Sequence, residues 1–305
     1  LPVSPGPAAV QVAQDRAFEK AHFVRCGVPV APHQVLAHAD DLPTVPNHLL
    51  PGILKTTRLG YDGKGQVRVN TRTELAVALA QLQNGHADVV CILEKRLPLA
   101  GECSVVLARG QDGDCVYLPV QLNQHRDGIL AITEVFEDAM PATTAQHAID
   151  AATHIARELD YVGVLCVEFF MLQDGPDKDA LGPLVVNEIA PRPHNSGHHS
   201  IDSCDLSQFA LQVRCMAGLP LTQPRLHSPC VMLNVLGDVW WLGGRNAQAP
   251  DWAAMLALPG VHLHVYGKAD ARPGRKMGHI TITASSITQA RAVSAQVASL
   301  LGLPT

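Results

Sequence analysis

Two acidic residues interrupt two apolar runs in the second half of the chain. Glu168 lies in the run 163–171 and Glu188 in the run 184–190, and both runs are typical of buried β-strands. A carboxylate in such a position must be paired, protonated or bound to a metal, because an unpaired buried charge destabilises a fold by several kcal/mol. The turn-rich segment 173–177 lets the two runs form a hairpin, which would bring the two carboxylates together.

An amide group completes this predicted site. Asn187 directly precedes Glu188, so the site offers two carboxylates and one amide oxygen. Hard oxygen ligands of this kind suit Mg²⁺, which usually retains water ligands and bridges the phosphates of a substrate. We therefore predict that Glu168, Asn187 and Glu188 bind a magnesium ion.

A glycine-rich loop upstream is the second candidate. Its residues are Gly60, Tyr61, Asp62, Gly63, Lys64, Gly65 and Gln66. Backbone N–H groups of such a loop can approach phosphate oxygens, and Lys64 and the preceding Lys55 supply positive charge. The loop also fits a simple β-hairpin, since Asp62-Gly63 is a turn dipeptide, and it matches neither common glycine-rich nucleotide motif. The acidic pair favours phosphate binding, because phosphate and magnesium sites occur together.

Charged residues at the end of a predicted strand give a weaker signal. The segment Glu94, Lys95, Arg96 and Leu97 follows an apolar run, and Glu102 comes shortly after it. Such a segment is commonly a solvated hairpin with surface charges. The functional alternative is an interdomain hinge whose backbone meets the edge of an adenine ring, with Glu102 accepting hydrogen bonds from ribose hydroxyls.

Histidines and cations gather in two further segments. His194, His198 and His199 suggest zinc, but their spacing matches no standard ligand pattern, so we interpret them as part of a string that anchors a substrate. Residues 268–279 place four cations around a Pro-Gly turn. A charge run is usually a solvated face, but in a chain of net charge −5 this concentration of positive charge suggests a bound phosphate.

Hydrophobic periodicity predicts a mixed α+β fold. The expected helices cover residues 15–26, 71–84, 145–159, 205–217 and 287–301. The expected strands cover residues 31–36, 52–57, 89–94, 103–109, 116–122, 163–171, 184–190, 231–236, 261–266 and 279–284. We expect Asp205 and Gln208 to cap the fourth helix and Gly218 to end it. The strands are consistent with an antiparallel sheet.

Composition excludes several classes of function. The 305 residues are 47% hydrophobic and 17% charged, which is typical of a globular protein, and the negative net charge argues against nucleic-acid or membrane partners. No apolar run approaches the roughly 18 residues that a membrane span needs. The eight cysteines include no Cys-x-x-Cys pair, which favours a reducing cytoplasm over a disulfide scaffold.

Three separate motifs resemble one family. The segment 187–198, followed by Ser207-Gln208-Phe209, is similar to the signature of the 5-(carboxyamino)imidazole ribonucleotide synthases, which are ATP-grasp enzymes of purine biosynthesis. The loop 60–66 and the basic segment 272–279 are similar to two further motifs of that family, in the same order.

The resemblance extends from about residue 10 to the C-terminus, because Asp15-Arg16 and Lys20 resemble the family's first helix. It implies an ATP-grasp fold, in which two α+β subdomains hold ATP, with a small β-rich C-terminal extension. The implied division is a linker at 1–14 from a missing Rossmann-like domain, a lid subdomain at 15–97, a large subdomain with the metal site at 98–224 and a C-terminal domain at 225–305. Leu59 departs from the family, since many relatives carry glycine there.

The implied reaction is the ATP- and bicarbonate-dependent carboxylation of 5-aminoimidazole ribonucleotide, without biotin. By resemblance, ATP is held by Arg16, Lys55, Gly60 to Gln66, Glu94 to Leu97, Glu102, His125, Asn187 and Glu188. The ribonucleotide is surrounded by Tyr61, Asp62, Lys64, Arg192, His194, Asn195, Lys268 and Arg275, of which Lys268 and Arg275 suit its 5′-phosphate. The implied catalytic residues are Lys55, Arg192, Asp62 and His194. Asp62 is our first candidate to accept the amine proton, and His194 is the second.

Other interpretations stay open at this stage. The resemblance implies a cytoplasmic homodimer whose partners are small molecules. The chain could instead be another ATP-grasp ligase, such as the formate-dependent glycinamide ribonucleotide transformylase, or a non-catalytic nucleotide-binding relative. The presence of Lys55, Glu168 and Glu188 argues against the last, since a binding module has little need for a complete magnesium pair.

Overall fold

The structure is a computed structural model that describes residues 3–60, 64–86, 88–242 and 248–303. Its α-helices are α1 (Pro7–Ala13), α2 (Arg16–Arg25), α3 (Arg72–Gln83), α4 (Ala142–Glu158), α5 (Pro176–Leu181), α6 (Ser200–Ser203), α7 (Gln208–Ala217), α8 (Trp252–Leu256) and α9 (Ile287–Leu300). Its strands are β1 (His33–Leu36), β2 (Gly52–Thr56), β3 (Gln66–Val69), β4 (Cys91–Lys95), β5 (Leu99–Arg109), β6 (Cys115–Tyr117), β7 (Gln121–Arg126), β8 (Ile129–Val135), β9 (Gly163–Leu172), β10 (Leu184–Ala190), β11 (Cys230–Leu236), β12 (Val261–Val265) and β13 (Lys276–Thr283).

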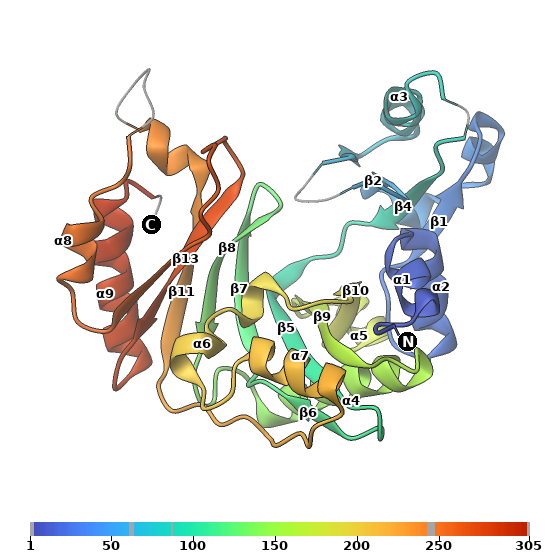
Figure 1. Cartoon of the computed structure of the whole chain (residues 1–305). Helices are drawn as coiled ribbons and strands as arrows, with labels where there is room; N and C mark the ends of the chain where they lie inside the picture. Colours follow the sequence, from blue (N-terminus) through green and yellow to red (C-terminus); the bar gives the residue numbers. More distant parts are fainter. Residues whose placement is uncertain (1–2, 61–63, 87, 243–247, 304–305) are drawn as a thin grey trace.

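These strands form two sheets. The small sheet has the order β1-β4-β2-β3, and the large sheet has the order β10-β9-β5-β7-β8-β11-β13-β12 with β6 paired to β5. Neighbouring strands in both sheets run antiparallel. The small sheet with α3 stands on one side of the central strands, and β11 to β13 with α9 stand on the other (Figure 1). The predicted α+β class and antiparallel pairing are confirmed.

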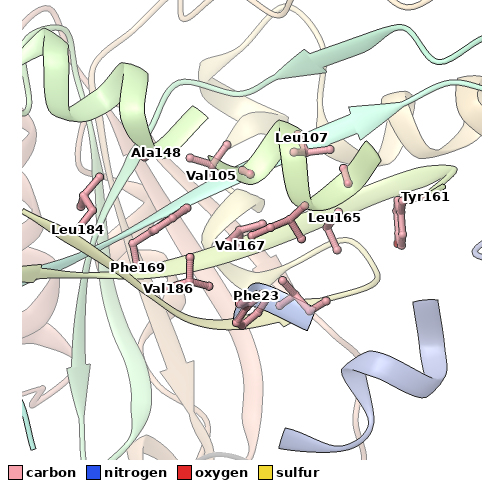
Figure 2. Close-up of a cluster of buried hydrophobic side chains, with 14 of the residues drawn as sticks. Phe23, Val105, Leu107, Ala148, Tyr161, Leu165, Val167, Phe169, Leu184 and Val186 are labelled. Carbon is pink, nitrogen blue, oxygen red and sulfur yellow. The ribbon is translucent and has the colours of Figure 1, made fainter. Parts of the chain in front are cut away.

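The core of the large sheet lies where α4 packs against β5, β9 and β10. Figure 2 shows Val105, Val167, Phe169 and Val186 of these strands together with Phe23 of α2, and all five side chains are buried. Helix α2 therefore packs on the large sheet, although its residues fall within the predicted lid subdomain. The division into domains stays a prediction.

Two predicted segments differ from the observed elements: one contains an unexpected helix, and the other begins later than predicted. The predicted linker 1–14 contains helix α1, which begins at Pro7, where the missing proline N–H costs nothing. The helix predicted at 205–217 begins only at Gln208 and is capped by Ser207, whose hydroxyl accepts a hydrogen bond from the Ala210 N–H. The predicted caps were therefore wrong. Asp205 instead accepts hydrogen bonds from Arg225, and the predicted stop at Gly218 is confirmed.

Proline explains two further differences. The strand predicted at 116–122 is divided into β6 and β7, with Pro119 in the gap, where it cannot donate a hydrogen bond to a neighbouring strand. The turn-rich connection between β9 and β10 contains the short helix α5, with Pro176 as its first residue. Neither change disturbs the predicted hairpin of the two acid-bearing strands.

The sheet continues without a break into the C-terminal part of the chain. β11 pairs with β8 on one side and with β13 on the other, so strands from both sides of residue 225 share one hydrogen-bonded sheet. Within the described residues no helix has the length and apolar character needed to cross a bilayer. The eight cysteines are free thiols, and six of them are buried.

Candidate active site

The two acids predicted to bind a metal lie opposite each other. β9 and β10 are antiparallel neighbours, and their register pairs Glu168 with Glu188 directly. Directly opposed residues of an antiparallel pair project from the same face, so the two carboxylates share one site. The predicted juxtaposition of Glu168 and Glu188 is confirmed.

The charges of this pair are unequal. Burial and the neighbouring charge of Glu188 raise the pKa of Glu168 well above its ordinary value. Burial also opposes ionisation of Glu188, but Arg16, whose Nη1 lies 2.8 Å from Glu188 Oε2, outweighs it and lowers the pKa of Glu188. At neutral pH the protonated form of Glu168 and the ionised form of Glu188 are therefore favoured. A divalent cation between them would favour ionisation of both carboxylates.

Two buried oxygens at this site have no hydrogen-bond partner among the described residues. They are Oδ1 of Asn187 and Oε1 of Glu168. Buried polar atoms are nearly always satisfied, so such atoms call for an explanation such as an ion. With Glu188 they form a set of oxygen ligands that fits Mg²⁺.

A β-bulge lies at two members of this set, Asn187 and Glu188. The register between β10 and β9 shifts between Val186 and Glu188, which leaves Asn187 as the extra residue. In a regular strand, neighbouring side chains such as those of Asn187 and Glu188 would point to opposite faces. A bulge re-aims side chains, and bulges are common next to active sites.

Three charged residues form a buried cluster beside the acids. Glu94 on β4 is 2% exposed, and its Oε2 lies 3.1 Å from Lys55 Nζ on β2 and 3.5 Å from Lys20 Nζ on α2. Burial opposes ionisation of Glu94, but the two lysines outweigh it and lower its pKa to about 2. For Glu94 the surface-charge alternative is therefore wrong, because its carboxylate points inward to Lys55, the lysine predicted to bind phosphate.

The other three residues of the predicted hinge, Lys95 to Leu97, lie partly on the surface and partly in the core. Lys95 forms an ion pair with Asp177, Arg96 is exposed and Leu97 is buried. In the large sheet, Glu102 on β5 and His125 on β7 come together, with His125 Nδ1 2.6 Å from Glu102 Oε2. Burial opposes protonation of His125, but Glu102 outweighs it and raises the pKa of the imidazole.

The glycine-rich loop is the tip of the hairpin between β2 and β3. Lys55 pairs with Gln66, and the Thr56 N–H donates to the Gly65 carbonyl, so the described residues on either side of the loop form a hairpin. Binding of phosphate by the loop stays a prediction. A Cβ added to Gly60 would lie 3.9 Å from Arg16 Nε, which places Gly60 beside Arg16. Tyr61, Asp62 and Gly63 lie outside the described residues.

The segment 194–199, which we call the histidine string, is held in place by Gln208 of α7. The Gln208 side chain accepts from the His194 N–H at 2.8 Å and donates to the His194 carbonyl at 2.7 Å. His194 Nδ1 lies 2.9 Å from Ser196 Oγ, and its Nε2 lies 3.6 Å from Glu168 Oε1. Burial and the charge of Arg192 lower the pKa of His194 to about 3, so its imidazole is neutral at physiological pH.

Asn195, predicted to touch the ribonucleotide, uses its side chain elsewhere. Its amide exchanges two hydrogen bonds with the amide of Asn234 on β11, at 2.9 and 2.6 Å, and both residues are buried. The pair fastens the histidine string to the C-terminal strands. Contact between Asn195 and a substrate stays a prediction.

The basic turn lies at the start of β13. Three cations gather here, namely Lys268, Arg275 and Lys276. Partial burial and the charges of the other two lower the pKa of Lys268. Lys268 also lies over the Tyr266 ring, 5.4 Å from its centroid. Charge from Lys276 reaches His194, which joins this turn electrostatically to the histidine string. The arrangement suits an anion such as a phosphate group.

A cavity elsewhere is not part of this site. It measures about 560 Å³ and lies between β8, β11 and α9, where Ile132, Val231, Leu233 and Ala298 are among its lining residues. Its walls are mainly apolar, although Gly274 of the basic turn and Asn234, the partner of Asn195, also line it.

Comparison with known proteins decides between the ligase families. The family model described as the ATP-grasp domain matches residues 21–209, and the model described as the phosphoribosylaminoimidazole carboxylase C-terminal domain matches residues 230–293. The N5-carboxyaminoimidazole ribonucleotide synthase of Brucella melitensis is 40% identical over 282 residues, which cover 92% of this chain and 72% of that protein. The synthase of Escherichia coli K12 is 38% identical, over 91% of this chain and 71% of that protein. The chain belongs to the N5-carboxyaminoimidazole ribonucleotide synthase family.

Solved structures of this synthase family agree. An ADP complex of a synthetase with this name has a TM-score of 0.82 at 35% identity, covering 96% of this chain and 72% of that one. The Aspergillus clavatus synthase, solved with ADP and 5-aminoimidazole ribonucleotide, has a TM-score of 0.84 at 28% identity, covering 99% of this chain and 77% of that one. The family resemblance, the ATP-grasp fold and the assignment to a ligase family are therefore confirmed.

Sequence analysis missed a buried polar network beneath the synthase-family site. Ser104 Oγ lies 2.9 Å from Ser196 Oγ and accepts a hydrogen bond from Asn123 Nδ2, which is linked in turn to Thr133. Ser104, Asn123 and Thr133 lie on β5, β7 and β8, and Ser196 joins them to His194, whose Nδ1 lies 2.9 Å from its hydroxyl. The available signal was Ser104, a polar residue within the apolar run 103–109, although the partners of such a residue are not visible in a sequence.

Proposed function

We propose that the protein uses ATP to carboxylate 5-aminoimidazole ribonucleotide with bicarbonate, giving 5-(carboxyamino)imidazole ribonucleotide, ADP and phosphate. The observation that carries the proposal is the opposed Glu168–Glu188 pair with the unpartnered Asn187 oxygen, beside buried Lys55. The names of the relatives and the nucleotide and ribonucleotide bound to the Aspergillus clavatus enzyme support this choice of substrates.

Glu168, Asn187 and Glu188 would hold Mg²⁺, which when bound neutralises charge on the phosphates of ATP. Lys55 and Arg16 would add positive charge on the protein side, since each already faces a carboxylate at this site. Phosphoryl transfer depends mainly on positioning and on such charge neutralisation. A buried site also protects a product that water would destroy.

Two bond exchanges complete the proposed reaction. A bicarbonate oxygen attacks the γ-phosphorus of ATP and ADP leaves, which produces carboxyphosphate. The exocyclic amine of the ribonucleotide then forms a C–N bond to the carboxyl carbon, and inorganic phosphate leaves. The amine loses one proton to a base in this second step.

Asp62 is our first candidate for that base. His194 is the second, but burial and Arg192 lower the pKa of its imidazole to about 3, which makes it a weak proton acceptor. A neutral His194 is better suited to orient the ribonucleotide together with Arg192. Lys268 and Arg275 would bind the 5′-phosphate at the basic turn.

We also propose that the protein is a cytoplasmic homodimer. The eight free cysteines are compatible with a reducing compartment. Light scattering coupled to gel filtration measures the mass in solution directly, and a monomeric mass would remove the dimer.

A phosphate-release assay with each substrate omitted in turn tests the proposal. We expect release to require ATP, magnesium, bicarbonate and 5-aminoimidazole ribonucleotide together. Formate with glycinamide ribonucleotide should not replace the last two. Release that depends on formate would assign the site to a different ATP-grasp ligase.

A further inference from the structure

One face of helix α2 is matched to three consecutive residues of β10. Lys20 Nζ donates to the Asn187 carbonyl at 2.8 Å, Arg16 Nη1 donates to Glu188 at 2.8 Å, and Glu19 Oε1 accepts from the Ile189 N–H at 2.7 Å. Positions 16, 19 and 20 are three and four residues apart, so they project from the same side of the helix. Of these contacts, the one from Lys20 falls on the bulge.

The carbonyl that Lys20 holds belongs to the residue outside the strand ladder. Asn187 has no register partner on β9, so its backbone needs another partner. Lys20 is 1% exposed and supplies that partner from the adjacent helix. A hydrogen bond from a charged donor to a buried carbonyl is among the stronger ones in a protein. Lys20 therefore fixes the backbone from which the Asn187 and Glu188 side chains project.

Lys20 has a second contact on its other side. Its Nζ lies 3.5 Å from Glu94 Oε2, and Lys55 approaches the same carboxylate oxygen at 3.1 Å. Lys55 comes from the small sheet and Lys20 from a helix packed on the large sheet. If Lys55 shifts its contact toward a phosphate, Lys20 still compensates the buried charge of Glu94.

We propose that Lys20 is a positioning residue for the magnesium–nucleotide site. It holds the bulge that turns Asn187 and Glu188 toward one ion, and it keeps Glu94 paired while Lys55 binds phosphate. This inference rests on the proposed function, because it assigns to Lys20 the support of the ligands that would bind the metal. A merely structural counter-ion for Glu94 would give the fold stability without affecting magnesium.

Binding of ADP with and without Mg²⁺ separates these roles without any turnover. In the unmodified protein we expect magnesium to tighten ADP binding, measured by calorimetry. In Lys20→Met we expect about a tenfold loss of that magnesium-dependent gain, while ADP binding without magnesium changes by less than about threefold. Lys178→Met, which removes a lysine of α5 that pairs with the exposed Asp174, is the control and should bind like the unmodified protein.

The double variant Lys20→Met/Glu94→Gln removes two of the three charges of this buried cluster and leaves Lys55, so it gives a second measurement if Lys20→Met alone does not fold. We expect the gain from magnesium to stay low in it. A full recovery of that gain would make Lys20 a counter-ion only and overturn the inference. An unchanged gain in Lys20→Met would do the same. If the unmodified protein gains nothing from magnesium, the proposed metal site fails first, and the inference fails with it.

Discussion

The opposed carboxylates determine the charge pattern at the residue scale. Glu188 faces Arg16 and stays ionised, whereas Glu168 faces Glu188 in a buried position and retains a proton. Two acids in one place therefore differ in charge because only one of them has a close cation. A magnesium ion that replaced this proton would bind both carboxyl groups in their ionised form.

Replacing one of these acids tests the metal site. Glu188→Gln keeps the size of the side chain but removes its charge, so we expect turnover to fall by about a thousandfold or more, with an unchanged circular dichroism spectrum. The steady-state phosphate-release rate measures the loss. Glu158→Gln, at the exposed end of α4, is the matched control. Turnover near that of the unmodified protein in Glu188→Gln would exclude Glu188 as a metal ligand.

The basic turn provides a test at a second residue. Arg275→Ala should weaken the ribonucleotide by about 10- to 100-fold, because a charge-assisted hydrogen bond to phosphate contributes roughly 1.5–3 kcal/mol. ATP binding should be unaffected. Arg272→Ala in the same turn is the control, since Arg272 is exposed and pairs with Asp270. Isothermal titration with each ligand distinguishes the two, and an equal loss for ATP would refute the phosphate role of Arg275.

At the scale of elements, the β2–β3 hairpin contains a strained residue. Leu59 has a φ of 60° and is 95% exposed. The left-handed region costs a residue with a Cβ roughly 1–2 kcal/mol, whereas glycine adopts it freely. Leu59 gains almost nothing from burial to offset that cost. The sequence signals this position only through the resemblance, since many relatives carry glycine there.

Leu59→Gly should therefore stabilise the protein. Glycine relieves the left-handed strain but adds about 0.4–1 kcal/mol of conformational entropy to the unfolded chain, so we expect a net gain of up to about 1 kcal/mol. Urea denaturation followed by fluorescence measures it. Leu59→Ala removes the exposed apolar side chain but keeps the Cβ, and it should give no gain. Equal stabilisation by alanine would show that exposure, and not backbone strain, is the cause.

Local patterns predicted the elements that carry the chemistry and missed those that depend on proline. The runs around Glu168 and Glu188 are strongly apolar, so their strands and their pairing could be read from the sequence. Helix α1 was missed because prolines and a glycine surround its start, a composition equally typical of linkers. The bulge at Asn187 could not be predicted, since it depends on contacts with β9 and α2.

At the scale of the whole molecule, long-range pairing builds the site. Arg16 and Glu188 are 172 residues apart in the chain, and Lys20 and Asn187 are 167 apart. No periodicity in the sequence specifies which helix covers which strand end. The resemblance to a family supplied that arrangement for the predicted ligands, but not for Lys20, Glu19 or the polar network below His194.

Buried ionisable groups also link the whole fold to pH. Burial lowers the pKa of four imidazoles to about 3 or 4, namely those of His194, His198, His199 and His279. Burial, with the charge of Glu188, raises the pKa of two carboxyls, those of Glu19 and Glu168, to about 8. As pH falls below 6.5, the unfolded chain binds imidazole protons that the folded protein does not bind, so the free energy of unfolding falls. As pH rises from 4.5 to 8, the unfolded chain releases carboxyl protons that the folded protein keeps. These two carboxyls therefore make the free energy of unfolding fall as pH rises.

These two effects predict a stability maximum near pH 6.5. Between pH 4.5 and 6.5 the four imidazoles outnumber the two carboxyls, so the free energy of unfolding should rise with pH. From pH 6.5 to 8 the two carboxyls, together with His125, whose imidazole pKa is raised by Glu102, bind more protons in the folded protein than in the unfolded chain, so it should fall. Urea denaturation at half-unit pH intervals measures the curve, and Glu19→Gln, which can still accept the Ile189 hydrogen bond, should make the fall above pH 6.5 shallower. A free energy of unfolding that keeps rising to pH 8 would mean that both carboxyls are ionised in the folded protein.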